Sequence, residues 1–184
     1  MLKNVNLTII KTVNGTLFEK INNLASVYKV LDWAGIFFAD YLLYIIIAAI
    51  LVILFVKRTR LMAIAITVSI FISRLVITEP LKQILHHPRP YIVLENTRKL
   101  ISESGDYLSF PSGHAATFFA IAIAVYFFDR KLGILSFIIA LLVGVARVYV
   151  GVHWPIDIVV GALIGIISGI ITHKYIIVPL IKRL

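Results

Sequence analysis

Apolar residues occur along this chain in long runs that shorter polar stretches separate. A helix needs about 20 residues to cross the hydrocarbon core of a bilayer, and each run approaches that length once its flanks are added. The pattern therefore predicts five membrane-spanning helices. Four of the runs are continuous and a fifth follows a histidine: Tyr41 to Val56, Leu61 to Thr78, Leu132 to Val145 and Ile156 to Thr172, and the segment from His114 to Phe128.

The segment before the first run, residues 21–39, is also helical in pattern but carries Asn22, Asn23, Lys29 and Asp32. Such a mixture is typical of a helix at a membrane interface. We expect an interfacial or partly inserted helix here, not a full span. The first 20 residues lack the continuous apolar core of a cleaved signal, so we expect the N-terminus to be retained.

Composition supports a membrane protein. Of the 184 residues, 60% are hydrophobic and 15% are charged, and the mean hydropathy of +0.99 lies outside the range of soluble domains. We expect an all-α, integral membrane helical bundle. It should form one domain over residues 1–184, with an amphipathic N-terminal segment at 1–39 and the main bundle at 40–172.

Positive residues gather in three short segments, 57–60, 130–131 and 174–183, and the net charge is +9. In a membrane protein an excess of lysine and arginine sets the orientation in the bilayer and favours contact with anionic lipids or an anionic substrate. We therefore expect no nucleic-acid partner. By the positive-inside rule the three segments face the cytoplasm, which places residues 79–113 and 147–155 on the extracytoplasmic side. Cysteine is absent, which excludes disulfides, thiolate metal sites and a cysteine nucleophile.

Three polar clusters fall on the extracytoplasmic side, at residues 82–90, 111–114 and 147–157. A connection as long as 79–113 is usually functional. The clusters combine cations, histidines, a hydroxyl and a carboxylate at the mouth of a helical bundle. Together they indicate an anion site with acid and base groups.

The second cluster, Pro111 to His114, opens a span with small polar residues. Ser112 and Gly113 leave the first N–H groups of the helix accessible, and the helix dipole favours an anion there. This pattern indicates a phosphate cradle. An ordinary helix cap is the alternative.

The third cluster pairs His153 with Asp157, one helical turn later. A carboxylate bonded to one ring nitrogen fixes the tautomer and leaves the other nitrogen as a nucleophile or base. His114 is then available to protonate a leaving oxygen. Two histidines of opposite role suit phosphoryl transfer through a phosphohistidine.

Three cations, Lys82, Arg89 and Arg147, supply positive charge for the oxygens of a transferring phosphoryl group. Each could instead extend to lipid headgroups at the membrane surface. The presence of all three beside two histidines favours the phosphate site.

These clusters resemble the three motifs of the type 2 phosphatidic acid phosphatase (PAP2) superfamily, KxxxxxxRP, PSGH and SRxxxxxHxxxD. One departure exists, because Ala146 stands where the motif has Ser. The resemblance covers about residues 40 to 172 and implies a six-helix arrangement, here five spans plus the N-terminal helix, without metal or cofactor. It implies a nucleophile, its orienting partner and a general acid at His153, Asp157 and His114, and phosphate binding at Lys82, Arg89, Ser112, Gly113 and Arg147.

Within the superfamily, the small size and the ARVYVGVHWPID version of the third motif look like the BcrC-type undecaprenyl-diphosphate phosphatases. The implied substrate is a polyprenyl diphosphate lipid carrier of peptidoglycan synthesis, recycled at the outer face of the bacterial plasma membrane, with bacitracin resistance at higher levels. Two alternatives stay open. One is a phosphatidylglycerophosphate or phosphatidate phosphatase, and the other is a phospholipid-binding or transport protein without hydrolysis.

Two further features lie outside the motifs. Arg74 comes late in the second span, where a charged side chain is energetically costly. We expect it to pair with Glu79 or, as the alternative, to contact the substrate. Gly161, Gly165 and Gly169 repeat every fourth residue on the last span and allow close helix approach. We expect this stripe to pack within the bundle, with a homodimer face as the alternative.

Overall fold

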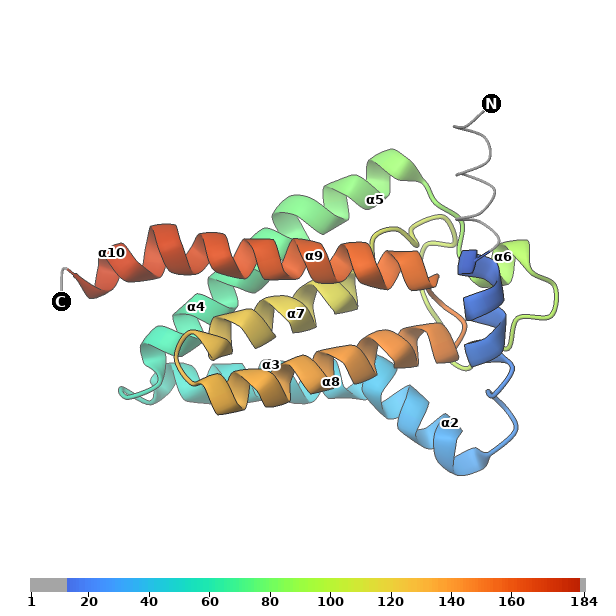
Figure 1. Cartoon of the computed structure of the whole chain (residues 1–184), viewed down its shortest axis with the longest axis horizontal. Coiled ribbons are helices and arrows are strands. Elements are labelled where there is room, and N and C mark those ends of the chain that lie inside the picture. The colour runs from blue at the N-terminus through green and yellow to red at the C-terminus, as the bar shows by residue number, and fades with distance from the viewer. Residues whose placement is uncertain (1–12, 183–184) are drawn as a thin grey trace.

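The computed structural model describes residues 13–182, and that part of the chain is helical apart from its turns and loops. The expectation of a retained N-terminus falls largely on residues 1–12, which lie outside the described residues. Residues 13–22 are helical, and the later elements are α2 (Lys29–Ile36), η1 (Phe37–Tyr41), α3 (Leu42–Phe55), α4 (Arg60–Ile70), η2 (Phe71–Thr78), α5 (Glu79–Leu85), α6 (Pro90–Val93), α7 (Gly113–Tyr126), α8 (Arg130–Tyr149), α9 (Pro155–Thr172), η3 (His173–Ile177) and α10 (Val178–Ile181) (Figure 1).

Several of these elements join end to end into longer apolar helices. Within the described residues four helical stretches are long and apolar enough to cross a membrane, and Gly113–Tyr126 is a shorter apolar helix. The four are Lys29–Phe55, Arg60–Val93, Arg130–Tyr149 and Pro155–Ile181. The all-α membrane bundle expected from the apolar runs is confirmed.

The helix expected over residues 21–39 is not continuous. A turn at residues 23–27 separates the helix at 13–22 from α2, which then runs on into η1 and α3 as part of the first long helix. The Asn22 side-chain amide donates to the carbonyl oxygens of Arg98 (2.9 Å) and Tyr149 (2.8 Å). The Ser26 N–H donates to Asp32 Oδ1 at 2.9 Å. Two of the polar residues that suggested an interfacial helix, Asn22 and Asp32, thus fix this turn.

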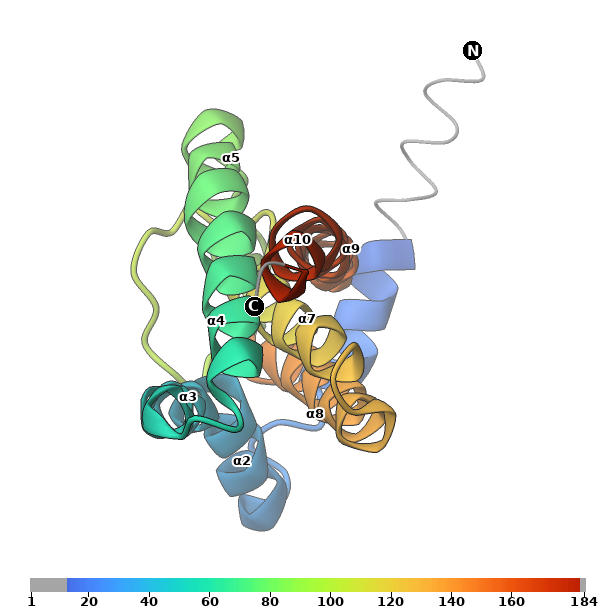
Figure 2. The same cartoon turned by 90° about the vertical axis from the view of Figure 1, so that its left-hand side faces the viewer.

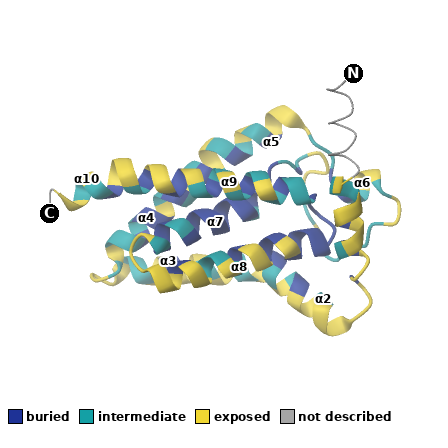
Figure 3. Cartoon of the chain, viewed as in Figure 1, coloured by how far each residue is buried: buried dark blue, intermediate teal, exposed yellow. Residues whose placement is uncertain are grey.

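Helix α7 lies at the centre of the bundle. Figure 2, which looks along the helices, shows it between α4, α8 and α9, and it contacts all three. Nearly every side chain of α7 is buried, which is why its sequence is apolar on all sides. The dark blue of α7 in Figure 3 contrasts with the exposed outer faces of its neighbours. At 14 residues α7 is also shorter than α8, which has 20.

The glycine stripe of α9 faces α7. A Cβ atom added at Gly161 would lie 2.5 Å from the Ser112 carbonyl oxygen, and one at Gly165 would lie 2.4 Å from that of Ala116. Only glycine permits this approach. The stripe therefore packs within the bundle, as expected, and is not free to form a dimer face.

This close packing brings the N-terminal ends of α7 and α9 together, and the Ser112 N–H donates to the Asp157 carbonyl oxygen at 3.0 Å. Figure 1 shows these two ends at the same end of the bundle as the C-terminal ends of α5 and α8. The α3–α4 and α7–α8 connections lie at the opposite end. The fold thus collects all three polar clusters at one end.

Candidate active site

His153 and Asp157 form a buried pair at the start of α9. Their side chains are 1% and 0% exposed, and His153 Nδ1 lies 3.2 Å from Asp157 Oδ2. The same oxygen accepts hydrogen bonds from the Trp154 N–H (2.9 Å) and from Ser109 Oγ (2.5 Å). A carboxylate held this way orients the imidazole with its Nδ1–H toward Asp157 and leaves the Nε2 lone pair on the far side.

The free nitrogen of His153 faces a guanidinium. Arg89 Nη1 lies 3.5 Å from His153 Nε2 and donates to the Val152 carbonyl oxygen at 2.8 Å. Burial lowers the pKa of His153 well below its usual 6.5, and the charges of Arg147 and Arg89 lower it further. The imidazole is therefore neutral near pH 7, which is the form that can act as a nucleophile.

Glu103 joins the two buried arginines of the site. Its Oε1 lies 3.6 Å from Arg89 Nη2, and its Oε2 accepts a hydrogen bond from Arg147 Nη2. Burial alone would raise the pKa of Glu103, but Arg147 and Arg89 outweigh it, so the pKa lies below the usual value. Glu103 is thus an ionised carboxylate between two guanidinium groups, a position that would suit a phosphate oxygen equally well. The sequence analysis did not single it out, because it belongs to no motif.

The start of α7 supplies backbone donors. Ser112 caps the helix, its Oγ accepting from the Ala115 N–H at 3.4 Å. Within residues 13–182 the N–H groups of Gly113 and His114 have no hydrogen-bond acceptor, and His114 Nε2 is buried without a partner. The Ser112 cap uses a later N–H than these two, so the expected cap leaves both N–H groups available to an anion.

Lys82 completes the set of expected site residues. It is only 7% exposed, and its Nζ lies 3.8 Å from Glu79 Oε1. In the described part of the chain no direct hydrogen bond joins Lys82 or His114 to the His153–Asp157 pair. The structure thus brings four expected residues into one bonded group with Glu103, namely His153, Asp157, Arg89 and Arg147. Ser112 joins this group through its backbone N–H.

Ser109 is a second residue that the sequence analysis missed. Its side chain is fully buried and contacts both members of the pair, at 2.5 Å from Asp157 Oδ2 and 3.5 Å from His153 Nδ1. Ala146, which replaces the motif serine, packs instead in an apolar cluster with Tyr149 and Val152. Among the described residues no group of three or more His, Asp or Glu side chains is placed to hold a metal ion.

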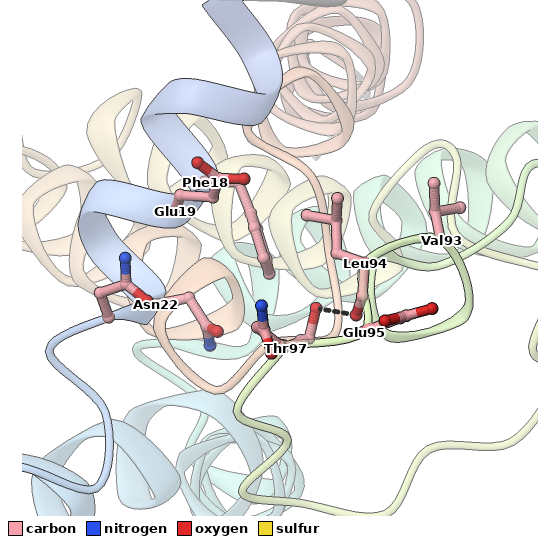
Figure 4. Close-up of a pocket in the computed structure, with 9 residues that line it drawn as sticks. Phe18, Glu19, Asn22, Val93, Leu94, Glu95 and Thr97 are labelled. Carbon is pink, nitrogen blue, oxygen red and sulfur yellow. Dashed lines mark hydrogen bonds between the residues drawn. The ribbon is translucent and has the colours of Figure 1, made fainter.

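A separate hollow lies between the helix at residues 13–22 and the loop after α6. Figure 4 shows Phe18, Glu19 and Asn22 on one side of it and the segment from Val93 to Thr97 on the other. None of the expected site residues lines this hollow. Its Asn22 bonds to backbone oxygens and so serves the fold.

Comparison with known proteins identifies the family and its relatives. The model of the PAP2 superfamily matches residues 38–178. The bacitracin transport permease protein BcrC of Bacillus licheniformis is 31% identical, over 86% of this chain and 78% of the relative. An undecaprenyl-diphosphatase of Sulfolobus acidocaldarius is 35% identical, over 83% of this chain and 73% of the relative. The crystal structure of Aquifex aeolicus LpxE superposes with a TM-score of 0.76 at 36% identity, covering 89% of this chain and 96% of that one.

Proposed function

The chain belongs to the PAP2 superfamily and is a multi-pass membrane lipid phosphatase, and from this premise we propose that it converts undecaprenyl diphosphate to undecaprenyl phosphate and phosphate. The observation that carries the chemistry is the buried His153–Asp157 pair, whose free nitrogen faces Arg89. The undecaprenyl-diphosphatase named among the relatives supports the choice of substrate. The proposed role is recycling of the lipid carrier, with the active site on the extracytoplasmic face of the plasma membrane.

In the proposed first step, His153 Nε2 attacks the terminal phosphorus. The bond from that phosphorus to the bridging oxygen breaks, and His114 gives its proton to the bridging oxygen as undecaprenyl phosphate leaves. Negative charge on the transferring group is balanced by Arg89, Arg147 and Lys82. The free N–H groups of Gly113 and His114 at the start of α7, which Ser112 caps, bind its oxygens.

In the second step, water attacks the phosphohistidine and His114, now neutral, accepts the proton of that water. The bond between phosphorus and Nε2 breaks, inorganic phosphate leaves and both histidines return to their initial state. Asp157 stabilises the imidazole in the same orientation throughout, because its carboxylate stays bonded to Nδ1.

A transport function is the second candidate, since one relative bears the name of a transport permease. Binding or moving a phospholipid requires the cations but gives no role to a histidine nucleophile with an orienting carboxylate. The two candidates therefore differ in what His153 is needed for.

The test is phosphate release by the purified protein in detergent with excess EDTA. Undecaprenyl diphosphate, phosphatidylglycerophosphate and phosphatidate are compared, and His153→Ala is the blank. We expect the diphosphate to be preferred and His153→Ala to lose at least about a thousandfold in kcat. Preference for a glycerophospholipid would overturn the substrate, and release from none of the three would favour transport. His86→Ala is the matched control, because His86 is an exposed histidine outside the proposed set.

A further inference from the structure

The site end of the bundle holds two pairs of cations, and one glutamate joins each pair. Glu103 joins Arg89 and Arg147 beside His153. Glu79 joins Arg74 and Lys82, with Oε1 lying 3.6 Å from Arg74 Nη2 and 3.8 Å from Lys82 Nζ. The proposed reaction uses the first pair fully, but it gives no role to Arg74.

The guanidinium of Arg74 lies directly against the start of α7. A Cβ atom added at Gly113 would lie 2.9 Å from Arg74 Nη1 and 3.3 Å from its Cζ. Glycine at this position therefore makes room for the guanidinium. Arg74 Nη1 is also buried, and no residue between 13 and 182 forms a hydrogen bond with it.

This arrangement is electrostatically incomplete. The N-terminus of a helix carries partial positive charge, so a cation placed there is unfavourable unless an anion accompanies it. Glu79 balances it only in part, because it is shared with Lys82 and both distances exceed hydrogen-bond length. The proposed reaction assigns the free N–H groups of Gly113 and His114 to the transferring phosphoryl group, which leaves Arg74 Nη1 as a donor for a second anion.

The position of Arg74 also indicates which part of a substrate it reaches. In-line displacement puts the leaving oxygen on the side of the phosphorus away from His153. His114 is the proton donor proposed for that oxygen, and Arg74 lies against the residue next to His114. An anion bound by Arg74 would therefore lie next to the leaving oxygen.

We propose that Arg74, beside Lys82, binds the phosphate that stays on the lipid, and so makes the site selective for diphosphates over monophosphates. This inference rests on the proposed function. A lipid monophosphate releases an alcohol, which offers Arg74 no formal charge to bind. A lipid diphosphate releases a phosphate group on which negative charge develops as the bond breaks, and a guanidinium can bind two of its oxygens.

The test compares farnesyl diphosphate with farnesyl phosphate as short-chain probes. Arg74→Gln should lower kcat/KM for the diphosphate by about 10- to 100-fold and for the monophosphate by less than about threefold. Arg74→Lys keeps the charge and should recover part of the loss. Arg58→Gln, which removes an exposed arginine at the opposite end of the bundle, should change neither value.

An equal loss on both probes, or no loss on either, would overturn the role of Arg74. Wild-type protein that releases phosphate only from the monophosphate would instead overturn the proposed function, and the inference with it. A second measurement needs no variant. Inorganic pyrophosphate should inhibit the wild-type protein at about tenfold lower concentration than inorganic phosphate, and equal potency would contradict a second phosphate subsite.

Discussion

At the scale of single residues, the orientation of His153 depends on one carboxylate oxygen. Asp157 Oδ2 accepts hydrogen bonds from His153 Nδ1, the Trp154 N–H and the Ser109 hydroxyl. Asp157 Oδ1 has no hydrogen-bond partner within residues 13–182. A buried carboxylate with its bonds on one oxygen has a fixed direction. Each donor to that oxygen therefore helps to aim the imidazole.

Replacing Ser109 by alanine tests this arrangement. A hydrogen bond to a charged group contributes about 1.5–3 kcal/mol, and each 1.36 kcal/mol is tenfold in rate. We expect Ser109→Ala to lower kcat about tenfold while KM changes little, because Ser109 contacts the pair and not the proposed phosphate cradle. Steady-state kinetics on the diphosphate substrate would measure both constants.

Ser109→Thr is the control, since it retains the hydroxyl and should retain most of the rate. If the threonine variant were as slow as the alanine variant, the size of the residue and not its hydrogen bond would be responsible.

At the scale of elements, the sequence was sufficient for the apolar helices and for the end at which the polar clusters meet, but not for the length of the first long helix, which begins at Lys29. The run from Tyr41 to Val56 corresponds to α3 at Leu42–Phe55, because long apolar periodicity depends only on local composition. The break after Asn22 could not be predicted, because its partners lie 76 and 127 residues further along the chain. Glu103 and Ser109 were missed because their partners are also distant in the sequence and because both residues lie on an irregular loop, whose path no periodic pattern specifies.

The contact between α7 and α9 gives a prediction at this scale. A methyl group at Gly165 would lie 2.4 Å from the Ala116 carbonyl oxygen and 2.8 Å from the Ala120 nitrogen, and both are backbone atoms of α7. Overpacking of this kind costs about 1–3 kcal/mol. Gly165→Ala should therefore lower the midpoint of thermal unfolding in detergent and reduce activity, because the same contact aligns the starts of α7 and α9.

Gly15→Ala is the matched control, since a methyl group there would meet nothing within 4 Å. Its midpoint should stay the same or rise slightly, as alanine favours a helix. Equal midpoints for the two variants would show that the helices can separate to admit the methyl group without loss.

At the scale of the whole molecule, the two ends of the bundle differ in chemistry. One end holds the proposed site, and the other holds the α3–α4 and α7–α8 connections with their lysines and arginines. From the positive-inside rule we predict that the second end faces the cytoplasm.

Single cysteines can test this orientation, because the chain has none of its own. Asn96→Cys and Arg58→Cys place one exposed thiol at each end. In intact cells a membrane-impermeant maleimide should label Asn96→Cys, and it should label Arg58→Cys only after permeabilisation. The reverse pattern would place the site on the cytoplasmic side.

The shortness of α7 has a consequence for how a lipid reaches the site. At 1.5 Å per residue its 14 residues span about 21 Å, about 9 Å less than the 20 residues of α8, which begins where α7 ends. The proposed phosphate cradle at the start of α7 therefore lies deeper in the bundle than the C-terminal end of α8 (Figure 1). If this cradle binds the substrate, the diphosphate must insert past the end of α8 while the hydrocarbon tail stays in the membrane. The depth of insertion would then select lipids with small, highly charged headgroups over those with bulky ones.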